Sequence, residues 1–132
     1  MPGRIRVAVG ATVVVFAYGT MAHLFQLAAG GSDPYPGLPV WLSVYFVSLT
    51  VLDPLAAALL VARRAAGLVL GGAVLLTDAV ANAYANYVLD PAPGVTPGRI
   101  GQAVITVLAL ALVAGAPRIR PWLRPDRAVG SY

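Results

Sequence analysis

The sequence predicts an all-α fold: an integral membrane four-helix transmembrane bundle of up-down topology, with both termini in the cytoplasm. The chain has 132 residues, of which 59% are hydrophobic and only 11% charged, and its mean hydropathy is +0.80. Four apolar stretches each reach the length of about 20 residues that a helix needs to cross a bilayer. Basic residues lie almost entirely on one side of these stretches. We therefore expect a single transmembrane domain over residues 1–132, with no room for a separate aqueous domain.

The first span is expected at about residues 7–29. Its second half carries the polar residues Tyr18, His23 and Gln26 in a mainly apolar stretch. The sequence GGSDPYPGLP follows at 30–39, and its Gly-Gly, Asp-Pro and Pro-Gly pairs each interrupt regular structure. We expect this segment to be an external loop.

The second span is expected at about residues 40–62 and carries Tyr45, Thr50 and Asp53. Proline has no backbone N–H, so Pro54 removes one helical hydrogen bond and disfavours helical geometry at the residue before it. We therefore predict a kink just before Pro54, with the Thr50 carbonyl deprived of its usual partner. Asp53 lies close to the middle of the span.

The third span, expected at about residues 67–89, is the most informative stretch because it combines sufficient length with polar side chains. Asp78, Asn82 and Asn86 recur at steps of four. Successive residues turn about 100° around a helix, so the three lie on one side of it. That side has to face protein, water or a ligand instead of lipid, and an ionisable group inside a span is by default a functional hypothesis.

A very short connection, Arg63 and Arg64, joins the second and third spans, so these spans should be antiparallel neighbours. Just after it, Gly67 and Gly71 form a small-xxx-small pair that allows two backbones to approach closely. We interpret this pair as packing within the monomer, with a homodimer seam as the alternative.

The fourth span is expected at about residues 97–116, with Thr96 as its N-cap and Pro97 at the first helical position. It is the least polar of the four spans, and we expect it to form a wall of the bundle. Pro117 is expected to end it. Residues 117–132 then form a basic tail, broken by prolines, which we place at the cytoplasmic interface.

All nine basic residues are arginines, and their distribution predicts the orientation of the chain. Arg99 stands alone between the third and fourth spans. The other eight lie before the first span, between the second and third, or after the fourth: Arg4, Arg6, Arg63, Arg64, Arg118, Arg120, Arg124 and Arg127. The positive-inside rule therefore places both termini in the cytoplasm.

The composition also bears on partners and location. Arginines at membrane borders, with none gathered on a soluble face, argue against nucleic acid as a partner and leave membrane lipids as the expected surroundings. The absence of lysine, with heavy use of alanine, glycine, valine and proline, indicates a GC-rich bacterial genome. We therefore place the chain in the bacterial cytoplasmic membrane.

The candidate site follows from the depths of the polar residues. A rise of about 1.5 Å per residue puts Asp53 and Asp78 near the midplane of alternating helices. A charged aspartate at a helix centre costs roughly 2.5–3.5 kcal/mol, so both carboxyls should be paired or protonated. We assign catalytic roles to Asp78 as general acid or base, Asp53 as its partner and His23 as an orienting group. The residues expected to bind the substrate around them are Asn82, Tyr45, Thr50, Asn86, Tyr18 and Gln26.

Several arrangements of these acids remain open. The two carboxyls can share a proton, or His23 can be protonated against one of them. In the alternative without chemistry, Asp53 satisfies the backbone opened by Pro54, while Asp78 forms hydrogen bonds between helices. The chain has no cysteine, and we assign no metal and no cofactor to the single histidine and the two acids.

These residues indicate a pocket that binds a hydrophobic small molecule. The chemistry they can supply without a cofactor is proton transfer, as in an isomerase or cyclase acting on a lipid-like or terpenoid substrate. A proton-coupled transporter and a non-catalytic accessory subunit are the alternatives. The four-span plan with acids inside the membrane resembles that of the sterol isomerase and sigma-2 receptor family. The resemblance lies in the architecture and carries over no individual residue.

Overall fold

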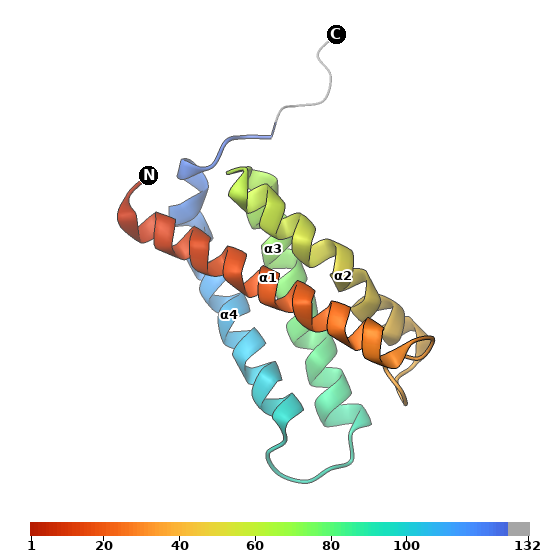
Figure 1. Cartoon of the computed structure of the whole chain (residues 1–132). Coiled ribbons are helices and arrows are strands. Elements are labelled where there is room, and N and C mark those ends of the chain that lie inside the picture. Colours follow the sequence, from red (N-terminus) through yellow and green to blue (C-terminus); the bar gives the residue numbers. More distant parts are fainter. Residues whose placement is uncertain (127–132) are drawn as a thin grey trace.

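The computed structural model describes residues 1–126 and consists of four long helices connected up and down (Figure 1). All four are long and apolar enough to cross a membrane, so the protein is a multi-pass membrane protein and the predicted all-α four-helix bundle is confirmed. The helices are α1 (Gly3–Gly30), α2 (Val40–Val61), α3 (Ala65–Ala83) and α4 (Pro97–Ile119). A π-helical turn, η1 (Tyr84–Leu89), continues α3, and a 3-10 turn, η2 (Arg120–Trp122), continues α4.

Each helix packs on the next one in sequence, whereas α1 and α4 make few contacts with each other. Figure 1 shows α1 crossing α4 close to the N-terminus and diverging from it further along. The bundle therefore has one loosely closed side, between its first and last helices. We call the end that carries the N-terminus and the α2–α3 turn the terminal end, and the end that carries loops 31–39 and 90–96 the loop end.

The fourth helix departs from expectation at its C-terminal end. Pro117 was expected to stop it, and this prediction is wrong, because α4 runs through Pro117 to Ile119. Proline removes the hydrogen bond to the Val113 carbonyl, and because only two residues of α4 follow Pro117, little of the helix lies beyond the break. The start of α4 is as expected: the Thr96 hydroxyl accepts a hydrogen bond of 3.1 Å from the Arg99 backbone N–H.

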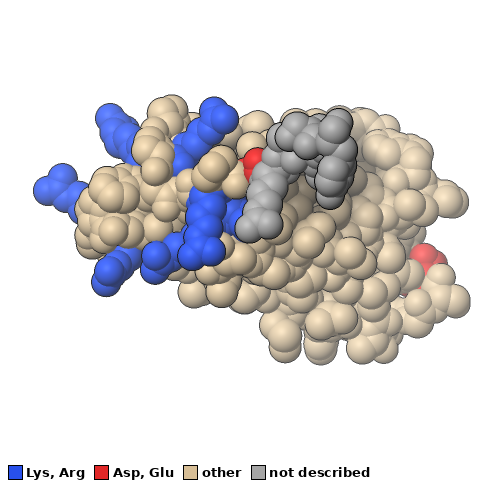
Figure 2. Space-filling model, turned by 90° about the horizontal axis from the view of Figure 1, so that it is seen from above, with Lys and Arg blue, Asp and Glu red and all other residues tan. Residues whose placement is uncertain are grey.

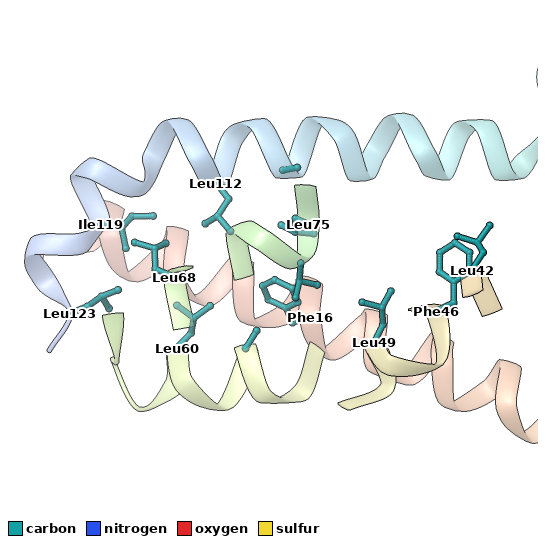
Figure 3. Packing of buried hydrophobic residues seen from close by; sticks show 13 residues of the cluster. Phe16, Leu42, Phe46, Leu49, Leu60, Leu68, Leu75, Leu112, Ile119 and Leu123 are labelled. Atoms are coloured by element: carbon teal, nitrogen blue, oxygen red, sulfur yellow. The ribbon is translucent and has the colours of Figure 1, made fainter. Parts of the chain in front are cut away.

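The core receives side chains from all four helices, most of them from α2, α3 and α4, and Figure 3 shows its largest side chains gathered between the helices. Phe16, from α1, is only 1% exposed and packs against the bare face of Gly71 in α3. A β-carbon at Gly71 would lie 2.9 Å from the ring, and one at Gly67 would lie 2.7 Å from the backbone nitrogen of Leu60. Both glycines of the small-xxx-small pair are thus used for packing within the chain.

The segment after η2 folds back on the α2–α3 turn. Ala65 donates a backbone hydrogen bond of 3.0 Å to the Arg124 carbonyl, and Arg124 donates one of 2.7 Å to the Arg63 carbonyl. Arg63 has a positive φ of 55°, so this turn is tight. Leu123 is buried beside it. The part of the expected basic tail at 127–132, which includes Arg127, lies outside the described residues.

Basic side chains gather at the terminal end, as Figure 2 shows in the view onto that end. Arg99 is the exception, and the structure gives it a local role. Its Nε donates a hydrogen bond of 2.9 Å to the Asn86 carbonyl, its NH1 group donates to the Gly94 carbonyl, and its guanidinium lies 4.9 Å from the centre of the Tyr87 ring. Arg99 therefore binds one backbone carbonyl of η1 and one of loop 90–96, and an aliphatic side chain at this position would leave both without this donor.

Candidate functional site

A cavity of about 560 Å³ lies between the helices toward the loop end. This volume is within the range of about 300–1,000 Å³ that is typical of small-molecule sites. Most of its wall is apolar, and α4 supplies Val104, Ile105 and Leu108, in agreement with the expectation that this helix forms a wall. The polar side chains that reach the cavity are Tyr18, His23, Gln26, Tyr35, Asp53, Asp78 and Asn82.

Asp53 and His23 are two ionisable side chains that face each other in this cavity. His23 Nε2, from α1, lies 3.7 Å from Asp53 Oδ2, from α2, and both side chains are largely buried. Asp53 is the only charged residue within residues 1–126 that is buried as a whole, at 6% exposed. A buried carboxyl needs a partner, because desolvation without one is costly. His23 is placed to be that partner.

Gly19 makes room for this pair. It lies one helical turn before His23 on the same face of α1, and a β-carbon there would lie 2.4 Å from Asp53 Oδ2. Any other residue at this position would displace the carboxyl. The close approach of α1 and α2 at the pair thus depends on a residue with no side chain.

The other ring nitrogen of His23 faces two groups that fix its protonation. Tyr35, in loop 31–39, donates a hydrogen bond of 2.6 Å to Gln26 Oε1. His23 Nδ1 lies 3.1 Å from the same Tyr35 oxygen and 3.2 Å from Gln26 Oε1. The phenol has already donated its hydrogen and the amide oxygen can only accept, so Nδ1 carries the proton in this network. In the neutral ring, Nε2 is then the bare nitrogen, and it faces Asp53.

This arrangement leaves one mobile proton between His23 Nε2 and Asp53 Oδ2, held on either the imidazole or the carboxyl. Tyr35 closes the loop side of the pair. Burial raises the pKa of the Tyr35 phenol, and the Asp78 carboxylate raises this pKa further. The phenol therefore stays protonated over the whole neutral range and keeps its place as donor to Gln26.

Asp78 has a partner on its own helix. Asn82 Nδ2 donates a hydrogen bond of 2.8 Å to Asp78 Oδ1 and one of 3.0 Å to the Asp78 carbonyl. Asn86 Nδ2 in turn donates to the Asn82 carbonyl over 2.9 Å. The three residues do form a continuous polar stripe along α3 and η1, as their spacing indicates. Asp78 and Asn82 reach the cavity, while the Asn86 amide packs against Gly98.

Asp53 and Asp78 line the same cavity, but each carboxyl has its own partner. Within residues 1–126 no hydrogen bond joins the two carboxyls. The site therefore contains two separate acid groups, one paired with an imidazole and one with an amide.

Three of the candidate residues lie away from the cavity wall, namely Asn86, Tyr45 and Thr50. The Tyr45 hydroxyl lies 2.7 Å from the Thr77 hydroxyl, between α2 and α3. The Thr50 hydroxyl oxygen is buried, and within the described part of the chain it has no hydrogen-bond partner. The candidates that the structure brings together around one cavity are Tyr18, His23, Gln26, Asp53, Asp78 and Asn82.

Two residues of the site were not predicted from the sequence. Gly19 lies four residues before His23, so helical spacing alone placed it on the face of the histidine, and this signal was available. Tyr35 was expected only as a loop residue. Its contact with His23 depends on how loop 31–39 folds back over the cavity, which no local pattern indicates.

Among residues 1–126, no group of three or more histidine, aspartate or glutamate side chains is placed to hold a metal ion. The polar groups of the cavity are suited to hydrogen bonding and proton transfer. No protein-family model matches the chain, and neither a curated protein nor a solved structure matches it.

Proposed function

We propose that the protein binds a hydrophobic small molecule inside the membrane and moves a proton on it, as an isomerase or cyclase does, without a cofactor. The observation that supports this proposal is the cavity of about 560 Å³ that reaches His23, Asp53 and Asp78 together. An apolar pocket with a few convergent polar groups is the usual form of a small-molecule site. Ionisable side chains within a span are costly, which favours a functional reason for having two of them.

The proposed chemistry uses the two acid groups separately. An isomerisation takes one proton from a carbon atom and returns one to another carbon, so it is balanced without an oxidant or a reductant. The Asp53–His23 pair holds one mobile proton, and Asp78, positioned by Asn82, supplies a second group that can accept or donate one. The apolar wall keeps water away from the intermediate carbanion or carbocation.

Deuterium exchange on a compact probe tests this proposal. Isopulegone, a terpenoid ketone with a β,γ double bond, isomerises by loss of a proton next to the carbonyl and gain of one at the far alkene carbon. In heavy water the purified protein should bind isopulegone and place deuterium on its carbon atoms. Mass spectrometry measures the incorporation. Binding without any incorporation by the wild-type protein would contradict the acid–base proposal.

Asp78 provides the matched variants. Asp78→Asn keeps an oxygen to accept from Asn82, so it should leave the melting temperature nearly unchanged while deuterium incorporation falls by about 100-fold or more. Asp78→Ala leaves the Asn82 amide without its partner and should also lose stability, by roughly 1–3 kcal/mol. Full exchange in Asp78→Asn would remove Asp78 from the chemistry, and an equal loss of stability in both variants would make it structural.

The proposal includes an orientation. The arginines at the terminal end support placing that end in the cytoplasm of a bacterium, with the cavity toward the outer half of the membrane. The loop end carries a single arginine, Arg99, against eight at the other end of the spans, so the bias remains strong.

A further inference from the structure

The cavity continues into a second, narrower space. A groove of about 250 Å³ runs between α1 and α4 toward the terminal end. It shares Val15, Leu75 and Leu108 with the wall of the cavity, so the two spaces adjoin. The remaining residues of the groove are small or apolar: Ala8, Ala11, Thr12, Ala111, Leu112, Gly115 and Ile119.

The groove is apolar along its length. Thr12 is its only polar residue, and the Thr12 hydroxyl already donates a hydrogen bond of 2.8 Å to the Ala8 carbonyl. Ala11 and Ala111 are exposed on the membrane side of α1 and α4. The groove is therefore open to the hydrocarbon region, on the side where the bundle is loosely closed (Figure 1).

The cavity is the polar end of this joined space, and its side chains disfavour a ligand head with a negative charge. Two carboxyls, Asp53 and Asp78, reach the cavity, and the histidine of the cavity is its only side chain that can become cationic. The arginines of the described chain lie at the ends of the helices, away from it. A phosphate or carboxylate head would face like charges with little compensation. A head that donates hydrogen bonds and carries no negative charge fits the carboxyl and amide oxygens.

We propose that the ligand of this site is a single-chain amphiphile with an uncharged, hydrogen-bond-donating head. The head occupies the cavity beside Asp53 and Asp78, and the chain lies in the groove between α1 and α4. This inference rests on the function proposed above and specifies the class of its substrate. The head lies on the loop-end side, and the chain extends from the middle of the bundle toward the terminal end. Such a molecule reaches the site sideways from the bilayer, without crossing water.

Two alanine-to-tryptophan variants on α4 separate the groove from the surrounding lipid surface. Ala111 lines the groove, whereas Ala114 is also exposed on the same helix but is not among the groove residues. Each variant and the wild-type protein are reconstituted in phosphatidylcholine vesicles that contain 1-monooleoylglycerol, oleate or isopulegone. After extraction in mild detergent, native mass spectrometry measures the fraction of protein that retains each probe.

We expect the wild-type protein to retain one molecule of 1-monooleoylglycerol and much less oleate, which has the same chain with an anionic head. Ala111→Trp should reduce retention of 1-monooleoylglycerol by about tenfold or more, because the indole ring would fill the space proposed for the chain. Ala114→Trp should retain it as the wild type does. Isopulegone, which is too short to enter the groove from the cavity, should bind equally to all three proteins.

Each other outcome overturns a defined part of the inference. Equal retention of 1-monooleoylglycerol in both tryptophan variants would remove the chain from the groove, while bound isopulegone would leave the proposed function standing. Retention of oleate at the level of 1-monooleoylglycerol would overturn the preference for an uncharged head. Failure of the wild-type protein to retain 1-monooleoylglycerol while it binds isopulegone would overturn the amphiphile class. If the wild-type protein bound neither 1-monooleoylglycerol nor isopulegone, the proposed function itself would be contradicted.

Discussion

Asp53 and Gly19 compete for the same space, since a β-carbon at residue 19 would lie 2.4 Å from Asp53 Oδ2. This relationship allows the contact between Asp53 and His23 to be broken without changing an ionisable group. Gly19→Ala should turn the carboxyl away from the imidazole and lower deuterium incorporation into isopulegone by about 100-fold. The polar groups of the cavity all remain in this variant.

The matched control is Gly10→Ala, in the same helix, where a β-carbon meets nothing within 4 Å. Alanine is the better helix former by roughly 0.5–1 kcal/mol, so Gly10→Ala should raise the melting temperature and leave exchange unchanged. Equal exchange in the two variants would show that the Asp53–His23 contact has no part in the chemistry.

Tyr35 gives the site a distinct response to alkaline pH. Its pKa is raised above the ordinary value of 10.0, first by burial and then by the charge of Asp78. The folded protein therefore keeps the phenol proton at pH values where the unfolded chain has lost it, so the contribution of Tyr35 is complete below about pH 10 and is lost as the pH rises further. Melting temperatures of Tyr35→Phe should fall less steeply above pH 10 than those of the wild type.

Tyr87→Phe is the control for this measurement, because Tyr87 packs under Arg99 at the loop end and is exposed. Its melting profile above pH 10 should follow that of the wild type. Tyr35→Phe should also change the nitrogen chemical shifts of the His23 ring, since Nδ1 loses the phenol oxygen as an acceptor. An unchanged ring spectrum would show that Tyr35 does not set the tautomer.

Thr50 has a buried hydroxyl oxygen with no partner within residues 1–126. Valine has nearly the same shape and no polar atom, so Thr50→Val should stabilise the protein by about 1 kcal/mol or more. Thr12→Val is the control, because the Thr12 hydroxyl donates a hydrogen bond to the Ala8 carbonyl. We expect no gain in stability from this variant. Thermal unfolding in detergent measures both. A loss of stability in Thr50→Val would show that the hydroxyl has a structural role, and a loss of probe binding would support the substrate-binding role predicted for this residue.

The orientation is tested with single cysteines, for which the chain is suited because it contains none. Ser32→Cys, in the loop after α1, should react with a membrane-impermeant maleimide in intact cells. Ala62→Cys, at the α2–α3 turn, should react only after the membrane is permeabilised. A reporter fused after Tyr132 should be active in the cytoplasm. Labelling of the cysteine at position 62 from outside would reverse both the topology and the assigned side of the cavity.

The architecture was predictable because it follows from local properties of the chain. Runs of apolar residues give the spans, and turn-forming residues such as those at 30–39 give the loops. The stripe of Asp78, Asn82 and Asn86 was also predictable, since it depends only on helical spacing within one element. The prediction for Pro117 was wrong because the effect of a proline depends on its distance from the helix end. That end was itself unknown from the sequence.

The pairing within the site was not predictable to the same degree. Depth along each helix placed Asp53 beside Asp78, but it carries no information on how the helices rotate about their axes. The rotation of α1 is set by the packing of Phe16 on Gly71 and by the missing side chain of Gly19, and it brings His23 to Asp53. Tyr35 adds a contact from a loop, whose path depends on the finished bundle.

The hydrogen bonds that join Arg124 to Arg63 and Ala65 link the last described part of the chain to the turn at its middle. The chain is made from its N-terminus, so Arg124 is synthesised after the hairpin of α2 and α3, and the Ala65 N–H and the Arg63 carbonyl gain this partner later. The contact is therefore among the last to form. A chain that stops short of Leu123 would still carry all four spans, yet its central turn would lack both of these hydrogen bonds.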